Sequence, residues 1–371
     1  MIADGKYDRP MVDGPKPQRE EQQPASEVVT EIAPGVLRAQ LPINMPGLGH
    51  VNMYVLEDER GVAVVDPGLP GKRSWSAIND RLRDASIPLS RVHTVIVTHS
   101  HPDHFGGAAR LRAETGAEIV THRRFRVLWD PSEPADHDVE DAADLASPDP
   151  PADTTRHHKP WDPTPWVGQG ISLSWKRRLG ITVARAFPQM MRLPTPTVRL
   201  DDAATIRLAG REWVAVHTPG HTEDHLCLYD PEGALMLCGD HVLPTITPHI
   251  SGLIGVADPL QQFFASLDKV AAFGPQVRLA LPAHGHPFED LAGRALAIKE
   301  HHDSRLQRLR DAATEIGRPA TVMEMSTHLF SPRAQGAMAD SETFAHLEHL
   351  RLAGDMERHD SDGAYHYVLT G

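Results

Sequence analysis

The sequence is poor in the residues that build covalent or thiolate-based sites. Only two cysteines, Cys227 and Cys238, occur among its 371 residues. That number excludes a disulfide scaffold and a cysteine-rich zinc module. The Gly-x-Ser-x-Gly turn that carries the nucleophile of serine hydrolases is also missing. Both cysteines lie in apolar stretches and are expected to pack in the core, so neither a cysteine nor a serine nucleophile is expected.

Long apolar segments are absent as well. No run approaches the roughly 18 residues that a membrane-spanning helix needs. Residues 1–24 are polar and rich in proline, and they lack the apolar centre of a secretory signal. We therefore expect a cytoplasmic protein with no membrane partner.

Basic residues are outnumbered, since 37 lysines and arginines stand against 50 aspartates and glutamates, a net charge of −13. Such a surface repels polyanions unless a local basic patch overrides it. Histidine, in contrast, is abundant, with 23 residues. Because histidine is the commonest metal ligand, the places where histidines cluster direct the search for a site.

Strand and helix patterns alternate in two blocks. Short apolar runs rich in β-branched residues predict strands, and stretches with helical spacing lie among them. The sequence predicts strands at 51–56, 61–65, 92–97, 117–120, 197–200, 205–208, 213–217, 226–229, 234–237 and 277–281, and helices at 74–85, 106–115 and 258–273. Two sheets with helices outside them fit this order, which is an α/β fold. We expect this domain to span residues 28–288, after a flexible tail at residues 1–27.

Residues 123–195 interrupt the pattern. They contain many prolines and four of the six tryptophans. A structureless loop of this length is uncommon inside a compact domain and is usually functional. We interpret the segment as an inserted lid, with some helix near residues 172–191, and expect Trp161 and Trp166 to contact substrate. A decorative surface insertion is the alternative.

The last part of the chain, residues 289–371, changes to helical patterns. Helices are predicted at 291–315, 321–330 and 341–352, and a strand at 365–369. This is the element order of a winged-helix-like domain. From His301 to Gly371 there are seven arginines, no lysine and eleven acidic residues. Since phosphate contacts need Lys and Arg, we expect packing, homodimer formation or completion of a pocket rather than nucleic-acid binding.

The strongest chemical signal is the run His99-x-His101-x-Asp103-His104 at the end of a predicted buried strand. Residues two apart in an extended segment point to the same side, so His99 and His101 can bind one metal ion together. Asp103 and His104 follow the turn at Pro102 and can face a neighbouring site.

Later strand-like runs also end in potential ligands. These are His217 and His221, Asp240 and His241, and His284 and His286. Donors at successive strand ends can converge at one edge of a sheet. The total is enough for two metal ions, with three histidines for one, a carboxylate and two histidines for the other, and a carboxylate between them.

These motifs resemble those of the metallo-β-lactamase-fold superfamily of hydrolases, over about residues 28–288. The shared motifs are Asp66 in Val-Asp-Pro-Gly, the run from His99 to His104, His221 in Thr-Pro-Gly-His-Thr, Asp240 in Cys-Gly-Asp and His284 in Pro-Ala-His-Gly. The winged-helix-like end is similar to that of the β-lactamase-like endoribonuclease and glyoxalase II-like branches. The resemblance implies a four-layer αββα sandwich with an inserted lid and a C-terminal helical domain.

The resemblance also implies a set of ligands. One metal ion would be bound by His99, His101 and His221, and a second by Asp103, His104 and His284, with Asp240 bridging the two. Asp66 would orient a ligand, and Asp103 and Asp66 are the residues expected to serve catalysis. His225 and His241 lie next to ligand positions and are candidates for substrate contact. Zinc is the expected metal, although His and Asp ligands also suit iron and manganese.

A divalent metal can lower the pKa of bound water from about 15.7 to about 7, which supplies hydroxide at neutral pH. We therefore predict a dinuclear hydrolase that uses a metal-bound hydroxide on a small-molecule ester, thioester, lactone or amide. A nuclease or phosphodiesterase of the same fold is the first alternative, and an iron-dependent oxidoreductase is the second. A non-catalytic protein of this fold would be expected to have lost ligands, and none is lost.

Overall fold

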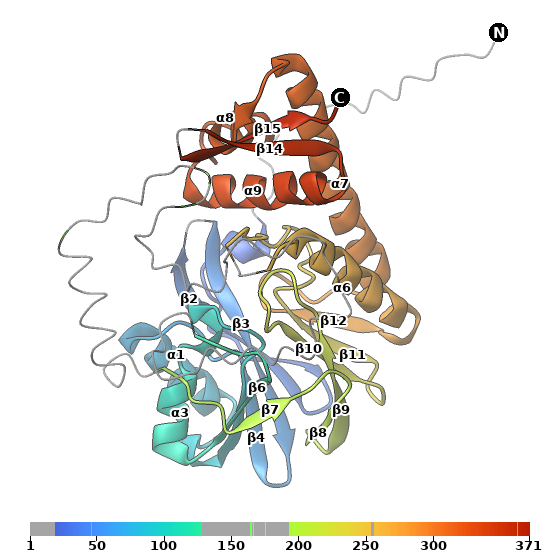
Figure 1. Cartoon of the computed structure of the whole chain (residues 1–371). Coiled ribbons are helices and arrows are strands. Elements are labelled where there is room, and N and C mark those ends of the chain that lie inside the picture. The colour runs from blue at the N-terminus through green and yellow to red at the C-terminus, as the bar shows by residue number, and fades with distance from the viewer. Residues whose placement is uncertain are drawn as a thin grey trace, which may run out of the picture.

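The computed structural model describes residues 19–45, 47–127, 164, 166, 175, 193–253, 256–361 and 363–371. Two sheets form its centre (Figure 1). The larger has seven strands in the order β1 (Thr30–Ala33), β2 (Val36–Met45), β3 (Leu48–Asp58), β4 (Gly61–Val65), β5 (Val92–Ile96), β6 (Glu118–His122) and β7 (Val198–Leu200). The smaller runs β12 (Leu279–Pro282), β11 (Leu235–Gly239), β10 (Leu226–Asp230), β9 (Arg211–His217) and β8 (Thr205–Leu208).

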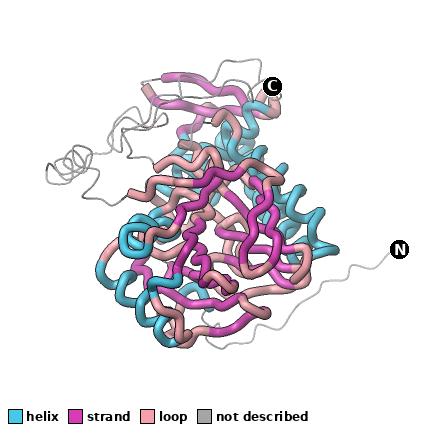
Figure 2. The backbone as a smooth tube through the Cα atoms, turned by 90° about the horizontal axis from the view of Figure 1, so that it is seen from below, coloured by secondary structure: helices cyan, strands magenta, loops and turns pink. Residues whose placement is uncertain are grey.

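Helices cover the outer faces of both sheets, and the strands lie inside them (Figure 2). Helices α1 (Lys72–Asp84) and α3 (Ala108–Thr115) pack against the seven-stranded sheet. The short helix α2 (Pro102–Phe105) follows β5 along the chain. Helix α6 (Pro259–Phe273) and the first part of α7 (Leu291–Ile316) cover the five-stranded sheet.

Three apolar cores separate the four layers, and the two-residue period of the strands explains them. In β3, Val55 faces the helices, whereas Tyr54 and Leu56 face the other sheet. In β11, Leu237 faces the first sheet, whereas Met236 packs toward α6 and α7. Because both faces of such strands are buried, they read as continuous apolar runs. The predicted four-layer αββα sandwich is confirmed.

Strands β1 and β2 were not predicted. In β2 the apolar pattern is interrupted by Arg38, Gln40 and Pro42, and the pairing with β3 shifts register after Pro42. Proline disturbs a strand ladder and is tolerated at such irregular positions. The pattern therefore hid a ten-residue strand.

The N-terminal segment joins the core earlier than the expected boundary at residue 28. The short 3₁₀ helix η1 (Glu20–Gln22) lies against β3. Glu20 accepts a hydrogen bond from Arg38 at 2.6 Å, and the carbonyl of Gln23 lies 3.0 Å from Nδ1 of His50. Residues 19–27 are thus held by side-chain and backbone contacts.

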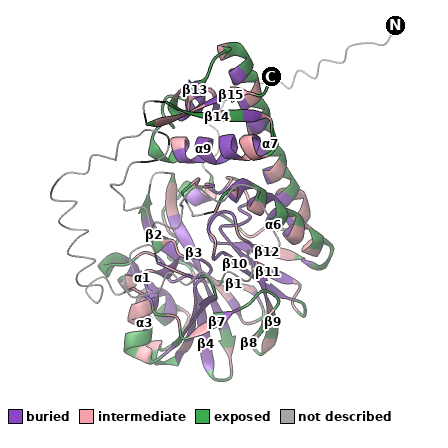
Figure 3. Ribbon diagram, in the orientation of Figure 1, coloured by how far each residue is buried: buried purple, intermediate pink, exposed green. Residues whose placement is uncertain are grey.

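The last unit consists of the end of α7, β13 (Ala320–Thr321), α8 (Val322–Leu329), α9 (Ala337–Leu352), β14 (Met356–Ser361) and β15 (Ala364–Leu369). Its strands form a small sheet in the order β13-β15-β14. The helical C-terminal region is confirmed, and its interpretation as a winged-helix-like domain stays a prediction. Helix α9 lies between this sheet and the rest of the molecule, and almost all of its residues after Met338 are buried or half-buried (Figure 3).

Within the expected insertion, the structure describes 123–127, Thr164, Trp166, Trp175 and 193–195. Trp161 and the helix expected near residues 172–191 lie outside the described residues except for Trp175. The lid therefore stays a prediction. None of the helices in the described part of the chain is both long and apolar enough to cross a bilayer.

Candidate metal centre

The seven predicted ligands converge where strands of the two sheets end. His99 follows β5, His221 follows β9, Asp240 follows β11 directly, and His284 follows β12. The remaining three belong to the turn that begins α2, where His101 is the N-cap, Pro102 is the first helical residue, and Asp103 and His104 follow. Proline at the first helical position is favourable because its missing N–H has no partner there in any case.

Three histidines and one carboxylate form the first cluster. Nδ1 of His101 lies 3.0 Å from Nε2 of His99 and 3.1 Å from Nε2 of His221. Oδ2 of Asp240 lies 3.9 Å from Nε2 of His99 and 3.6 Å from Nε2 of His221. Ring nitrogens of three different residues thus point at one common position.

Asp103, His104 and His284 form the second cluster. Oδ2 of Asp103 lies 3.6 Å from Nε2 of His104 and 3.5 Å from Nε2 of His284. Oδ2 of Asp240 is 3.5 Å from Nε2 of His104, and its Oδ1 is 3.4 Å from Nε2 of His284. The carboxylate of Asp240 therefore faces both clusters.

Backbone carbonyls fix two of the imidazole rings. Nδ1 of His221 donates to the carbonyl of His249 at 2.7 Å, and Nδ1 of His284 donates to the carbonyl of His50 at 2.8 Å. A carbonyl can only accept, so Nδ1 carries the proton in each ring. In the neutral ring the lone pair is then on Nε2, which faces the site. Metal-binding histidines are usually held in this way.

Asp66 fixes a third ring. Its Oδ2 lies 2.9 Å from Nδ1 of His104 and accepts from Oγ1 of Thr98 at 2.7 Å, and its Oδ1 accepts from the backbone N–H of Thr98 at 2.9 Å. Asp66 is buried and has a φ of +53°. A non-glycine residue in this region is uncommon and is found often at functional sites. These contacts hold the ring of His104 in place, and the role of Asp66 in orienting a metal ligand stays a prediction.

Several polar atoms at the centre have no hydrogen-bond partner although they are buried. They are Nε2 of His104, Nε2 of His284 and Oδ1 of Asp240. A buried polar atom without a partner is costly and calls for an explanation. Nε2 of His284 lies 3.4 Å from Oδ1 of Asp240, and Nε2 of His104 lies 3.5 Å from Oδ2 of the same carboxylate. The residues present therefore fit divalent metal ions between them.

The pKa shifts favour metal binding at the first cluster. Burial holds the pKa of His99 well below its usual value, and burial together with the charge of His221 lowers the pKa of His101. Both rings are therefore neutral, as a metal ligand must be. Burial acts to raise the pKa of Asp240, but the imidazoles of His284 and His104 outweigh it, and the pKa is well below its usual value. At the second cluster burial acts to lower the pKa of His104 and His284, but the carboxylates of Asp103 and Asp240 outweigh burial and raise it, so these two rings must release a proton when metal binds.

A further group, His302, Glu342 and His346, also has potential ligand atoms within 4.8 Å of one another. Its atoms are mostly engaged by protein. Glu342 pairs with Arg305, and Nδ1 of His302 lies 3.0 Å from Nε2 of His346. The guanidinium beside the carboxylate makes this group a weaker metal site than the two clusters around Asp240.

His225, which is expected to contact substrate, makes its hydrogen bonds in the structure with protein groups. Its Nε2 accepts the backbone N–H of Asp240 at 3.0 Å, and its Nδ1 lies 2.7 Å from Oγ1 of Thr218. The ring is fully buried. Gly239 makes the approach possible, because a Cβ there would lie 2.6 Å from Nε2 of His225, and its φ is +49°. These contacts hold the ring of His225 against the backbone of Asp240, and substrate contact by His225 stays a prediction.

We expect His225→Ala to lower metal affinity by about tenfold, the lower end of the range for residues that orient ligands. The change leaves a buried N–H at Asp240 without an acceptor, which costs about 1–3 kcal/mol of stability. Competition with a chromogenic chelator and denaturant unfolding measure the two effects. An unchanged metal affinity together with a higher KM would instead favour substrate contact by His225.

The other two described candidates for substrate contact also lie in packed surroundings. His241 is fully buried, lies 5.1 Å from the ring of Phe263, and has a pKa lowered to about 3 by burial. Trp166 is buried against Phe344 of α9, with ring centroids 5.0 Å apart. Trp166 thus ties the inserted segment to the C-terminal unit.

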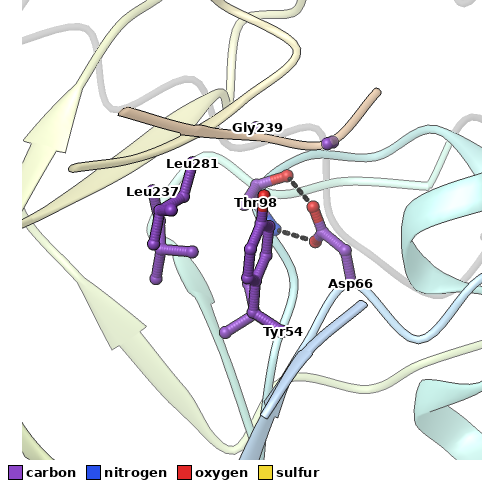
Figure 4. A pocket seen from close by; sticks show the side chains of 8 residues that line it. Tyr54, Asp66, Thr98, Leu237, Gly239 and Leu281 are labelled. Atoms are coloured by element: carbon purple, nitrogen blue, oxygen red, sulfur yellow. Dashed lines mark hydrogen bonds between the residues drawn. The ribbon is translucent and has the colours of Figure 1, made fainter. Parts of the chain in front are cut away.

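Sequence reasoning missed the groups that hold the ligands from outside. No recognisable motif marks these orienting groups, which are Thr98 and the carbonyls of His50 and His249. Any residue type supplies a carbonyl, so the two carbonyls leave no signal in the sequence. Thr98 also lines a narrow gap between the sheets, with Tyr54, Asp66, Leu237, Gly239 and Leu281 among its neighbours (Figure 4). That gap is too small to hold a substrate.

Known proteins match both the sequence and the fold. The model of the metallo-β-lactamase superfamily matches residues 46–300. A hydroxyacylglutathione hydrolase from Albidiferax ferrireducens is 25% identical over 252 residues, which are 67% of this chain and 68% of that protein. An atrochrysone carboxyl ACP thioesterase from Passalora fulva is 26% identical over 343 residues, 88% of this chain and 78% of that protein.

A solved structure extends the similarity to nearly the whole chain. A metallo-β-lactamase family protein from Thermus thermophilus superposes with a TM-score of 0.67 at 27% identity. The match covers 92% of this chain and 100% of that protein. The similarity therefore includes the C-terminal unit as well as the sandwich.

Proposed function

The chain belongs to the metallo-β-lactamase superfamily of hydrolases, and on that premise we propose that it is a dinuclear enzyme that cleaves small thioesters. His99, His101 and His221 would hold one ion, and Asp103, His104 and His284 the other, with zinc as the first choice of metal. The observation that carries the proposal is the position of Asp240, whose two carboxylate oxygens face both clusters.

When bound, the two ions would supply hydroxide near neutral pH and polarise the carbonyl oxygen of the substrate. The protein supplies the geometry. Asp66 keeps Nε2 of His104 directed inward, and the carbonyls of His249 and His50 do the same for two further rings. Because these groups are set before substrate arrives, no reorganisation is needed during the reaction.

The choice of thioesters among carbonyl substrates draws on the relatives. One is named for the hydrolysis of hydroxyacylglutathione and the other as a thioesterase. Esters, lactones and amides remain the neighbouring candidates, because fold and metal set are shared among chemistries. We further propose that residues 28–288 form the catalytic domain, and that residues 123–195, with Trp161 and Trp166, shape substrate choice.

The C-terminal unit favours a small substrate over a nucleic acid. Helix α9 would be the helix that a winged-helix protein places on DNA or RNA, and its residues Glu342, Phe344, Leu347 and Glu348 are buried in the protein. A helix must expose basic side chains to bind phosphates. We therefore propose that this unit serves packing within the enzyme.

We expect the purified protein to contain two metal ions per chain and to hydrolyse acyl thioesters faster than esters, lactones, β-lactams and phosphodiesters of similar size. Chelation should abolish turnover, and added Zn²⁺ should restore it. Elemental analysis and a panel of chromogenic substrates check this. Two ions with a preference for phosphodiesters would reject the thioester assignment, whereas a chain without bound metal would reject the whole proposal.

A further inference from the structure

Helix α9 of the C-terminal unit packs closely on the loop 249–253, which lies beside the metal centre. The carbonyl of Ser341 accepts the N–H of Gly252 at 3.3 Å, and the hydroxyls of Ser251 and Ser341 are 3.1 Å apart. Only glycine fits at residue 252, because a Cβ there would lie 2.5 Å from Cδ1 of Phe344 and 3.1 Å from the backbone N of Ala345. The loop and α9 are therefore in close contact.

Glu342 is the residue of α9 that reaches back to this loop. Its Oε2 lies 3.5 Å from Nδ1 of His249, and its other carboxylate oxygen accepts from Arg305 of α7. Burial acts to raise the pKa of Glu342, but its contacts with His249 and Arg305 outweigh burial and hold the pKa at about 2. The carboxylate is therefore charged at neutral pH and attracts both groups.

His249 passes this contact on to the metal centre. Its carbonyl accepts Nδ1–H of His221 at 2.7 Å, so the position of the loop sets the orientation of the His221 ring. The sequence of contacts is thus Arg305 to Glu342, Glu342 to the side chain of His249, and the backbone of His249 to His221. Four separate parts of the chain meet along it, namely α7, α9, the loop 249–253 and the turn after β9.

We propose that Glu342 is a positioning residue of the metal centre, through which the C-terminal unit holds His221 in its ligand orientation. The inference rests on the proposed metal-binding role of His221. It makes the C-terminal unit part of the active site, although it supplies no ligand itself. Groups that orient a ligand typically change metal affinity by about 10- to 100-fold when lost. Since Glu342 acts through His249, we expect the lower end of that range.

The same helix offers a matched control in Glu348. Both glutamates are 7% exposed, and both are paired with arginine. The hydrogen bonds of Glu348 among the described residues, however, stay within the C-terminal unit, where it accepts from Arg351, Arg358 and the hydroxyl of Tyr367. Its loss should disturb the packing of the unit as the loss of Glu342 does, but should not reach His249.

The experiment compares Glu342→Gln with Glu348→Gln in the full-length protein, with thermal unfolding and Zn²⁺ affinity as readouts. We expect both to lower the melting temperature. Only Glu342→Gln should weaken binding of one of the two ions, by about tenfold. Glu348→Gln should change affinity by less than about twofold, as for distant independent sites. Equal affinities in the two variants would overturn the proposal.

A second variant covers the case in which Glu342→Gln folds poorly because Arg305 is left without its partner. The double variant R305Q/E342Q removes both charges and should recover stability. If Glu342 positions the centre, the weakened Zn²⁺ binding persists in the double variant. Recovery of full affinity would reduce Glu342 to a structural role. Wild-type protein that binds no Zn²⁺ would instead refute the proposed function. The failure of the proposed function is thus distinguishable from the failure of the positioning role of Glu342.

Discussion

Asp240→Ala is expected to remove both metal ions and to reduce hydrolysis by about a thousandfold or more. Asp240 is the proposed ligand whose carboxylate faces both clusters, with Oδ2 3.6 Å from Nε2 of His221 and Oδ1 3.4 Å from Nε2 of His284. A bound metal contributes several kcal/mol to catalysis, and each 1.36 kcal/mol is a factor of about ten in rate. Metal analysis after gel filtration, together with kcat/KM, measures the result.

Asp230 provides the control for this change. It is also a buried aspartate at a strand end, but it pairs with Arg211 at 2.9 Å and caps the turn at residues 232–233. Asp230→Ala should destabilise the protein and keep both metal ions. If Asp240→Ala retained the metal content of the wild type, the bridging assignment would be wrong.

Asp66→Asn is expected to lower metal affinity by about 10- to 100-fold while leaving the fold intact. Asparagine has the same shape as aspartate and tolerates a positive φ, such as the +53° at this position. Its amide, however, has one accepting oxygen, whereas the carboxylate accepts from Thr98 twice and from His104. The ring of His104 should therefore lose its orientation.

Zn²⁺ competition and circular dichroism test this second prediction. Asp58→Asn is the matched control. Asp58 is the last residue of β3, away from the metal centre, and its Oδ1 lies 3.3 Å from Nε2 of His93. That variant should bind Zn²⁺ as the wild type does. Wild-type affinity in Asp66→Asn would show that His104 needs no support from Asp66.

The sequence by itself determined the layers and the ligand types. The β-branched run of β5 and the apolar run of β11 predicted strands, and the residues that follow them, such as His99 and Asp240, predicted donors at one edge. These features are local, since the apolar pattern of a strand and the donor that follows it lie within a few residues of each other in the sequence. Less regular elements such as β2 escaped, because Pro42 and inward-facing polar residues broke the period.

Only the tertiary structure decided how each ligand is held. His221 is oriented by a carbonyl 28 residues later, and His104 by a carboxylate 38 residues earlier. The contact of His225 with the backbone of Asp240 likewise depends on the tertiary structure rather than on the residue type. The link from Glu342 to His249 crosses from the C-terminal unit to the sandwich. Such contacts depend on how the layers pack against one another. A hydrogen bond between residues that are far apart in the sequence produces no residue pattern from which it could be predicted.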